Sequence, residues 1–123
     1  FGKGRNPMNH PVVMFRKSRV EAAGGYEHFP LFEDYYLWVK MLCRGEKFYN
    51  LPDSLLWFRQ SGDVYKRRGG LKYAMDEVKF QREICRLGFI GNATMVKNVV
   101  IRFGVRLVPN WLRGMIYKRL LRK

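Results

Sequence analysis

The chain has 123 residues, 47% of them apolar, which excludes a chain that is disordered by composition and allows one domain with a modest core. There are 24 Lys or Arg residues against 10 Asp or Glu residues, so the formal net charge is +14. A positive field this strong favours an anionic partner: phosphate groups, nucleic acid or an acidic membrane surface. The longest apolar runs fall far short of the roughly 20 residues that a membrane-spanning helix needs.

Two features of the chain bear on its compartment and its completeness. Cys43 and Cys85 lie in apolar helical patterns and are interpreted as reduced core thiols, with a disulfide or a redox pair as the alternative. The chain begins at Phe1, without a methionine, in the basic and loop-like stretch FGKGRNPMNH. We therefore expect it to be a piece of something longer.

The first predicted elements are short. Residues 1–10 are rich in Gly, Asn and Pro and are predicted to form a loop. Residues 12–15, the apolar run VVMF, predict a short buried strand. Ser18 and Glu21 have the spacing of a capping box and predict a short helix, which the glycine pair at 24–25 ends.

The stretch FPLFEDYYLWVKMLCRG, residues 29–45, predicts a helix from about residue 32 to residue 44. Its large apolar residues repeat at spacings of three and four, and a glycine follows it. The helix opens on two adjacent carboxylates, Glu33 and Asp34. They either cap the helix or face a site that needs negative charge, and spacing alone favours capping.

Residues 47–50 and 55–59 are predicted to be two short extended pieces around the turn LPDS. A polar, basic loop, SGDVYKRRGG, follows at residues 61–70. After it the pattern is helical only, with three amphipathic segments near residues 73–87, 92–107 and 110–120.

The motifs NHPVVMFRKSRVEAAGGY, FEDYYLWVKML and GEKFYNLPDSLLWFR, taken in this order, resemble the C-terminal half of a bacterial family 2 glycosyltransferase catalytic domain. The resemblance covers roughly residues 6–70. It implies an α+β fold class: a partial GT-A-like domain with a few short strands in the first 60 residues, followed by a helical C-terminal half. Residues 1–70 would be the acceptor-side part of the domain, and residues 71–123 a helical basic tail.

The resemblance also implies a function. Such enzymes move a sugar, here of the hexose type, from a nucleotide-sugar donor to a hydroxyl acceptor in cell-surface polysaccharide or glycolipid synthesis. Asp34 would be the general base and Glu33 a supporting carboxylate. The family holds Mg or Mn on an aspartate-rich DxD motif, which this chain lacks. We therefore expect the metal only in the full-length enzyme, and no activity from this part alone.

Several other residues are candidates for binding the acceptor or the diphosphate. His10 could do either, although a loop histidine bonded to backbone is the simpler interpretation. Arg59, Arg67 and Arg68 could hold the leaving diphosphate, because guanidinium groups pair with phosphate oxygens; a solvated basic loop is the alternative. Trp38 and Trp57 are expected to pack in the core rather than to stack on sugars.

The last part of the chain, residues 109–123, places an interfacial tryptophan and apolar residues beside cations. It predicts either binding to an anionic membrane surface or packing on its own domain. We expect a cytoplasmic protein, peripheral on the inner face of the plasma membrane. A basic nucleic-acid- or membrane-binding module is the alternative function, but no nucleic-acid motif is present, so we expect no nucleic-acid partner. A sheet edge and apolar surface left by a missing half could make this part a homodimer.

Overall fold

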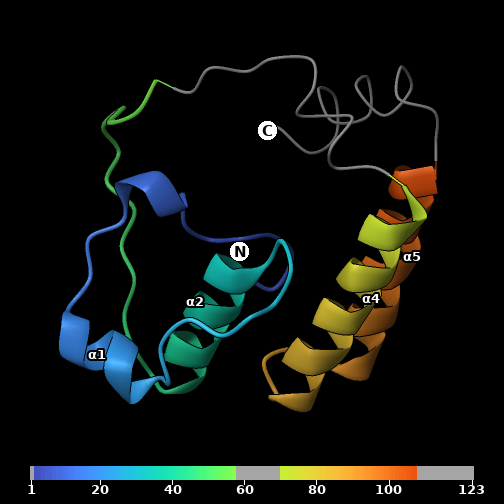
Figure 1. Ribbon diagram of the computed structural model, residues 1–123, viewed down its shortest axis with the longest axis horizontal. Coiled ribbons are helices and arrows are strands. Elements are labelled where there is room, and N and C mark those ends of the chain that lie inside the picture. The colour runs from blue at the N-terminus through green and yellow to red at the C-terminus, as the bar shows by residue number, and fades with distance from the viewer. Residues whose placement is uncertain (1, 58–69, 108–123) are drawn as a thin grey trace.

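The computed structural model describes residues 2–57 and 70–107. Within these residues the chain forms a short 3-10 helix and four α-helices (Figure 1). Their bounds are η1 (His10–Val12), α1 (Lys17–Ala22), α2 (Glu33–Cys43), α4 (Leu71–Arg86) and α5 (Asn92–Leu107).

Helix α2 lies between the other helices and is buried on two sides. Tyr35, Tyr36 and Val39 pack into one cluster together with residues of α4, and Phe80 stacks on Phe32 with ring centroids 4.8 Å apart. The other side packs against α1 and its flanking loops through residues that share the opposite helical face: Leu37, Trp38 and Met41. Both faces of α2 are covered, and eight of its eleven residues are accordingly apolar or aromatic.

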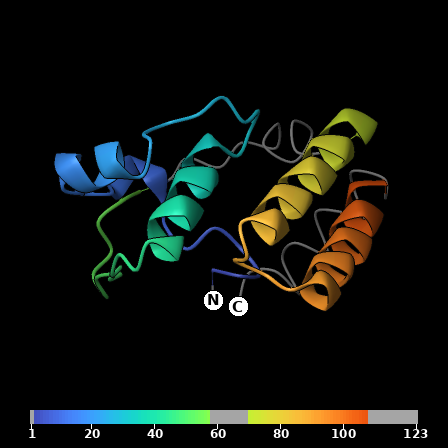
Figure 2. The ribbon, with the colours of Figure 1, turned by 90° about the horizontal axis from the view of Figure 1, so that it is seen from below.

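Helices α4 and α5 form an antiparallel pair that packs against α2 from one side (Figures 1 and 2). Gly88, in the connection between them, has a φ of 75°, a left-handed conformation that glycine adopts without a steric penalty. Phe80 and Ile84 of α4 are fully buried against α2. The pair therefore closes the larger of the two core clusters.

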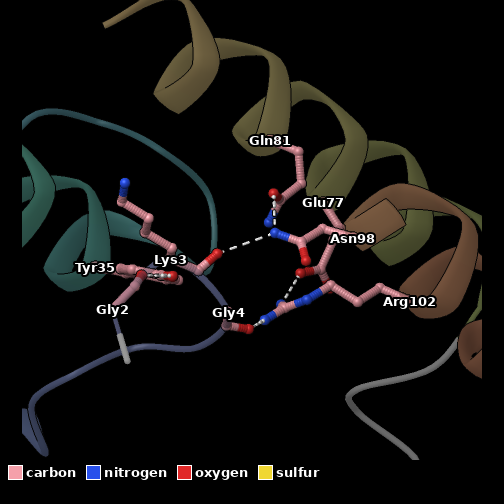
Figure 3. Close-up of polar contacts among 8 residues, drawn as sticks. All are labelled: Gly2, Lys3, Gly4, Tyr35, Glu77, Gln81, Asn98 and Arg102. Carbon is pink, nitrogen blue, oxygen red and sulfur yellow. Dashed lines mark hydrogen bonds and ion pairs between the residues drawn. The ribbon is translucent and has the colours of Figure 1, made fainter. Parts of the chain in front are cut away.

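Residues 2–9, which we call the N-terminal strap, run between α2 and the α4–α5 pair (Figure 2). Three consecutive carbonyl groups of the strap accept side-chain hydrogen bonds (Figure 3). Tyr35 Oη donates to the Gly2 carbonyl at 2.5 Å, and Asn98 Nδ2 donates to the Lys3 carbonyl at 3.0 Å. Burial raises the pKa of Tyr35 to about 12, so its hydroxyl stays a donor through the physiological pH range.

The third contact belongs to Arg102 of α5, which donates from one guanidinium nitrogen to the Gly4 carbonyl. Its other terminal nitrogen donates to Glu77 of α4, which is only 1% exposed (Figure 3). A carboxylate at that depth needs a cation and hydrogen bonds to offset its lost hydration. The Glu77–Arg102 pair therefore joins α4, α5 and the strap in one network.

The predicted strands are not present, so the α+β expectation for the first 60 residues is wrong. The structure contains helices and no strand in residues 2–57 and 70–107. Val13 and Arg16 do have extended dihedral angles, but the segment around them joins no ladder among the described residues. A strand needs a neighbouring backbone to hydrogen-bond to, and the apolar run alone does not supply one.

The predictions for the helices are mostly confirmed. The helices expected near residues 32–44, 73–87 and 92–107 are present with small shifts at their ends. Helix α1 begins at Lys17, with no side-chain hydrogen bond at its N-cap, so the predicted capping box at Ser18 is wrong. The segment near residues 110–120 lies outside the described residues.

The structure places Trp38 in the core, as predicted, but the core predictions for Trp57 and Cys43 are wrong. Trp38 is fully buried, as expected, but Trp57 is 98% exposed and packs in no core. Both cysteines are free, yet Cys43 is exposed rather than buried. The failure at residue 57 follows from the missing strand, because a tryptophan in an unpaired extended segment has no sheet face to pack on.

The buried ion pair leads to a stability prediction. Replacing Arg102 by Met removes a charged hydrogen-bond donor from buried Glu77, so we expect the free energy of unfolding to fall by about 3 kcal/mol. The control is Lys17→Met, which removes the cation from the exposed Lys17–Glu21 pair and should change stability by less than about 0.5 kcal/mol. Urea denaturation followed by circular dichroism measures both, and equal losses would contradict the role given to Arg102.

Candidate functional site

The two carboxylates stand at the start of α2, after a backbone turn with an unusual conformation. Leu31 has a φ of 70°, a left-handed conformation that costs a residue with a side chain about 1 kcal/mol or more. The N-cap residue, Phe32, makes no side-chain capping bond. Glu33 and Asp34 therefore occupy the first turn, where free N–H groups and the helix dipole favour negative charge.

Both carboxylate oxygens of Asp34 accept hydrogen bonds, and the two donors come from different parts of the chain. Oδ1 accepts a hydrogen bond from the backbone N–H of Tyr35 at 2.7 Å. Oδ2 accepts one from Asn6 Nδ2, in the strap, at 2.9 Å. Asp34 is half-buried. It thus ties down one amide of its own helix, as the capping interpretation expects, and also reaches out to a segment 28 residues away.

Tyr26 follows the glycine turn that leads from α1 toward α2. Gly24 and Gly25 have φ values of 88° and 64°, so this turn needs glycine at both positions. Lys40 of α2 holds the turn by donating to the Gly25 carbonyl at 3.0 Å. Burial, and then the negative charge of Asp34, raise the pKa of the Tyr26 hydroxyl above its ordinary value. The phenol therefore lies within the field of the carboxylate and remains a neutral donor.

His10, the first residue of η1, completes the group. Its Nδ1 lies 3.5 Å from the hydroxyl oxygen of Tyr26, and the two rings meet edge to face with centroids 5.8 Å apart. On its other side the imidazole lies 6.3 Å from the ring of buried Trp38. His10 itself is exposed. The imidazole thus contacts the side chains of Tyr26 and Trp38.

We define the Asp34 cluster as Asn6, His10, Tyr26 and Asp34. Asn6 is hydrogen-bonded to Asp34, His10 lies against Tyr26, and the charge of Asp34 acts on the Tyr26 hydroxyl. A carboxylate offers about four lone pairs, so Asp34 keeps acceptor capacity beyond its two present bonds. With an exposed imidazole and a phenol nearby, the cluster is suited to bind a hydroxyl group and take its proton.

The other predicted site residues either make no hydrogen bond with the Asp34 cluster or lie outside the described residues. Glu33 is half-buried and makes no hydrogen bond or ion pair with the residues that the structure describes. Arg59, Arg67 and Arg68 lie outside the described residues. Sequence reasoning missed Asn6 and Tyr26, because an Asn and a Tyr in polar loops carry no signal of what they face.

The described residues offer no grouping of three His, Cys, Asp or Glu side chains that could hold a metal ion. The divalent ion that the family resemblance implies therefore finds no ligand set in this part of the chain. No helix among the described residues is long and apolar enough to cross a membrane.

Comparison with curated proteins supplies the family. The chain is 41% identical over 123 residues to an Escherichia coli protein, UDP-Gal:alpha-D-GlcNAc-diphosphoundecaprenol beta-1,3-galactosyltransferase. It is 39% identical over 123 residues to an uncharacterized glycosyltransferase of Haemophilus influenzae, and 34% identical over 119 residues to the amylovoran biosynthesis glycosyltransferase AmsE of Erwinia amylovora. The curated homologues of this chain are glycosyltransferases.

The alignments cover 97% to 100% of this chain but 45% of each glycosyltransferase. The chain thus spans less than half the length of these relatives and matches their C-terminal part. This confirms the resemblance to the C-terminal part of a glycosyltransferase. No protein-family model and no solved structure matches the chain.

The glycine turn that carries Tyr26 leads to a second stability prediction. Gly25→Ala should lower the free energy of unfolding by about 1 kcal/mol, because alanine is strained at a φ of 64° although open space surrounds the site. Gly104→Ala is the matched control, since Gly104 lies within α5 with open space around it. There alanine should raise stability by about 0.5 to 1 kcal/mol. Thermal denaturation compares the two, and a change of the same sign in both would contradict the requirement for glycine at position 25.

Proposed function

We propose that the full-length protein is a family 2 glycosyltransferase that transfers a hexose from a nucleotide sugar to a hydroxyl of a lipid-diphosphate-linked sugar. The product would serve the synthesis of a cell-surface polysaccharide or glycolipid. The names of the relatives from Escherichia coli and Erwinia amylovora support this class of reaction. The observation that carries the proposal is the half-buried carboxylate of Asp34, which accepts hydrogen bonds from Asn6 and from the backbone of its own helix.

In the proposed step, Asp34 acts as general base. The acceptor hydroxyl oxygen attacks the anomeric carbon of the donor sugar, and a new C–O bond forms as the bond to the diphosphate oxygen breaks. The hydroxyl proton passes to Asp34, and the nucleoside diphosphate leaves with the electron pair. A single displacement of this kind inverts the anomeric carbon, and it needs a carboxylate within hydrogen-bond reach of the attacking oxygen.

The other residues of the cluster would bind and orient the acceptor. The Tyr26 hydroxyl stays protonated near neutral pH, so it can donate to an acceptor oxygen. His10 is exposed and can donate to a hydroxyl or a diphosphate. Glu33 would support the acceptor site, and Arg59, Arg67 and Arg68 would supply positive charge to the leaving diphosphate. A divalent ion, Mg or Mn, would neutralise that diphosphate in the full-length enzyme.

Asp34→Asn in the full-length protein tests this proposal. The amide keeps the shape of the carboxylate but cannot accept the proton, so we expect transfer to fall by about 10²- to 10⁴-fold. The assay starts with UDP-galactose and a GlcNAc-diphosphate lipid, the pair in the name of the Escherichia coli relative. Asp53→Asn, in an exposed loop, is the control and should retain full activity. A folded Asp34→Asn protein with normal transfer would remove Asp34 from the mechanism.

We also propose that the protein binds peripherally to an anionic membrane surface on the cytoplasmic side, where a lipid-linked acceptor would be presented. The support is compositional, because residues 109–123 combine Trp111 with apolar side chains and five cations: Arg113, Lys118, Arg119, Arg122 and Lys123. These residues lie outside the part of the chain that the structure describes. Basic residues near anionic lipid contribute about 1 kcal/mol each, which is enough for salt-sensitive binding.

Vesicle flotation tests the membrane proposal. The full-length protein should float with vesicles that contain phosphatidylglycerol and lose binding when the salt is raised to about 1 M, because salt screens the attraction. Deletion of residues 109–123 should abolish flotation. The alternative, a nucleic-acid-binding module, predicts instead a salt-sensitive complex in a gel-shift assay. Flotation that survives the deletion would contradict the role of this segment.

A further inference from the structure

We propose that Asn6 is a positioning residue for Asp34, and that the N-terminal strap transmits the position of α5 to this carboxylate. The inference rests on the proposed function of Asp34 as general base. It starts from the hydrogen bond of 2.9 Å between Asn6 Nδ2 and Asp34 Oδ2. Helix capping does not require this bond, because its donor comes from outside the helix.

The orientation of the Asn6 amide is determined by its two partners. Asn6 Oδ1 accepts the backbone N–H of Met8 at 3.2 Å, while Nδ2 donates to Asp34. A flipped amide would place its NH₂ group against an N–H donor and its oxygen against a carboxylate oxygen, so both bonds would be lost. The turn that Asn6 makes with Met8 therefore aims a donor at Asp34.

The strap that carries Asn6 is held on both sides of this residue. Upstream, Asn98 and Arg102 of α5 donate to the carbonyl groups of Lys3 and Gly4, as Figure 3 shows. Downstream, Asn50 Nδ2 donates to the Pro7 carbonyl at 3.1 Å. Because Arg102 is itself fixed by buried Glu77, the strap has a rigid anchor two residues before Asn6.

Two donors on two different oxygens fix both the place and the plane of the Asp34 carboxylate. The Tyr35 N–H holds Oδ1, and without Asn6 the group could turn about that single contact. A general base that is displaced by about 1 Å can lose about 10²-fold in rate, while substrate binding is little affected. The expected signature of a positioning role is therefore a fall in kcat with a nearly constant KM.

The variant Asn6→Asp in the full-length transferase separates this role from the structure of the strap. The new carboxylate keeps the shape of the side chain and the acceptor for the Met8 N–H, but it turns the donor facing Asp34 into a negatively charged acceptor. We expect kcat to fall by about 10- to 100-fold with KM changed less than about threefold. Repulsion between the two carboxylates should also move the acid limb of the pH–kcat profile to higher pH.

The variant leaves the other titratable groups of this region unchanged: Glu33, the neighbour of Asp34 in the sequence; Tyr26, on which the charge of Asp34 acts; and His10, which contacts Tyr26. A shift of the acid limb of the pH–kcat profile in Asn6→Asp would therefore arise from the changed contact between residue 6 and Asp34. Asn92→Asp is the matched control, because it makes the same chemical change at an exposed position of α5, outside the strap and the Asp34 cluster, and keeps the oxygen that accepts from Cys85. It should leave kcat within about twofold of wild type and the pH profile in place.

Wild-type kcat and pH profile in Asn6→Asp would overturn the proposal, as would equal losses in Asn6→Asp and Asn92→Asp. If Asn6→Asp does not fold, as judged by thermal melting, Asn6→Ala removes the donor without adding charge, and wild-type kcat there would overturn it equally. Asp34→Asn distinguishes failure of the proposed function from failure of the positioning role of Asn6. If that variant is active the proposed function fails, whereas an inactive Asp34→Asn beside a normal Asn6→Asp defeats only the positioning role.

Discussion

The ion pair between Glu77 and Arg102 is the interaction on which the rest of the described structure depends. Glu77 is almost fully buried in α4, and a carboxylate in that position is tolerated only with a charged partner. Arg102 supplies the charge from α5 and uses its second nitrogen to hold the Gly4 carbonyl. One buried charge thereby sets the packing of two helices and the path of the N-terminal strap.

That path decides what surrounds Asp34. The strap crosses from α5 to the start of α2, where Asn6 donates a hydrogen bond to the carboxylate. The two interpretations of the acidic pair at the head of α2 are therefore compatible. One oxygen of Asp34 serves the helix, as a first-turn acid does, and the other is held by the strap. A carboxylate held from two sides is better placed for proton transfer than one that only closes a helix.

Homology and geometry support different conclusions about this protein. The curated relatives show that this chain matches the C-terminal part of glycosyltransferases. Each of these relatives is more than twice as long as this chain. The contacts of Asp34 say which residue of this chain could serve such a reaction and what holds it in place.

The sequence by itself determined the helices α2, α4 and α5, because helical hydrogen bonds join residues four apart and the apolar periodicity reports which face is buried. It also singled out Asp34, through the order of the surrounding motifs. Only the tertiary structure decided that residues 12–15 join no sheet, that Trp57 is exposed, and that Asn6 holds Asp34. The physical reason is separation along the chain: the bond from Asn6 spans 28 residues and that from Arg102 to Gly4 spans 98. No local pattern encodes such contacts, since they exist only once the helices have packed.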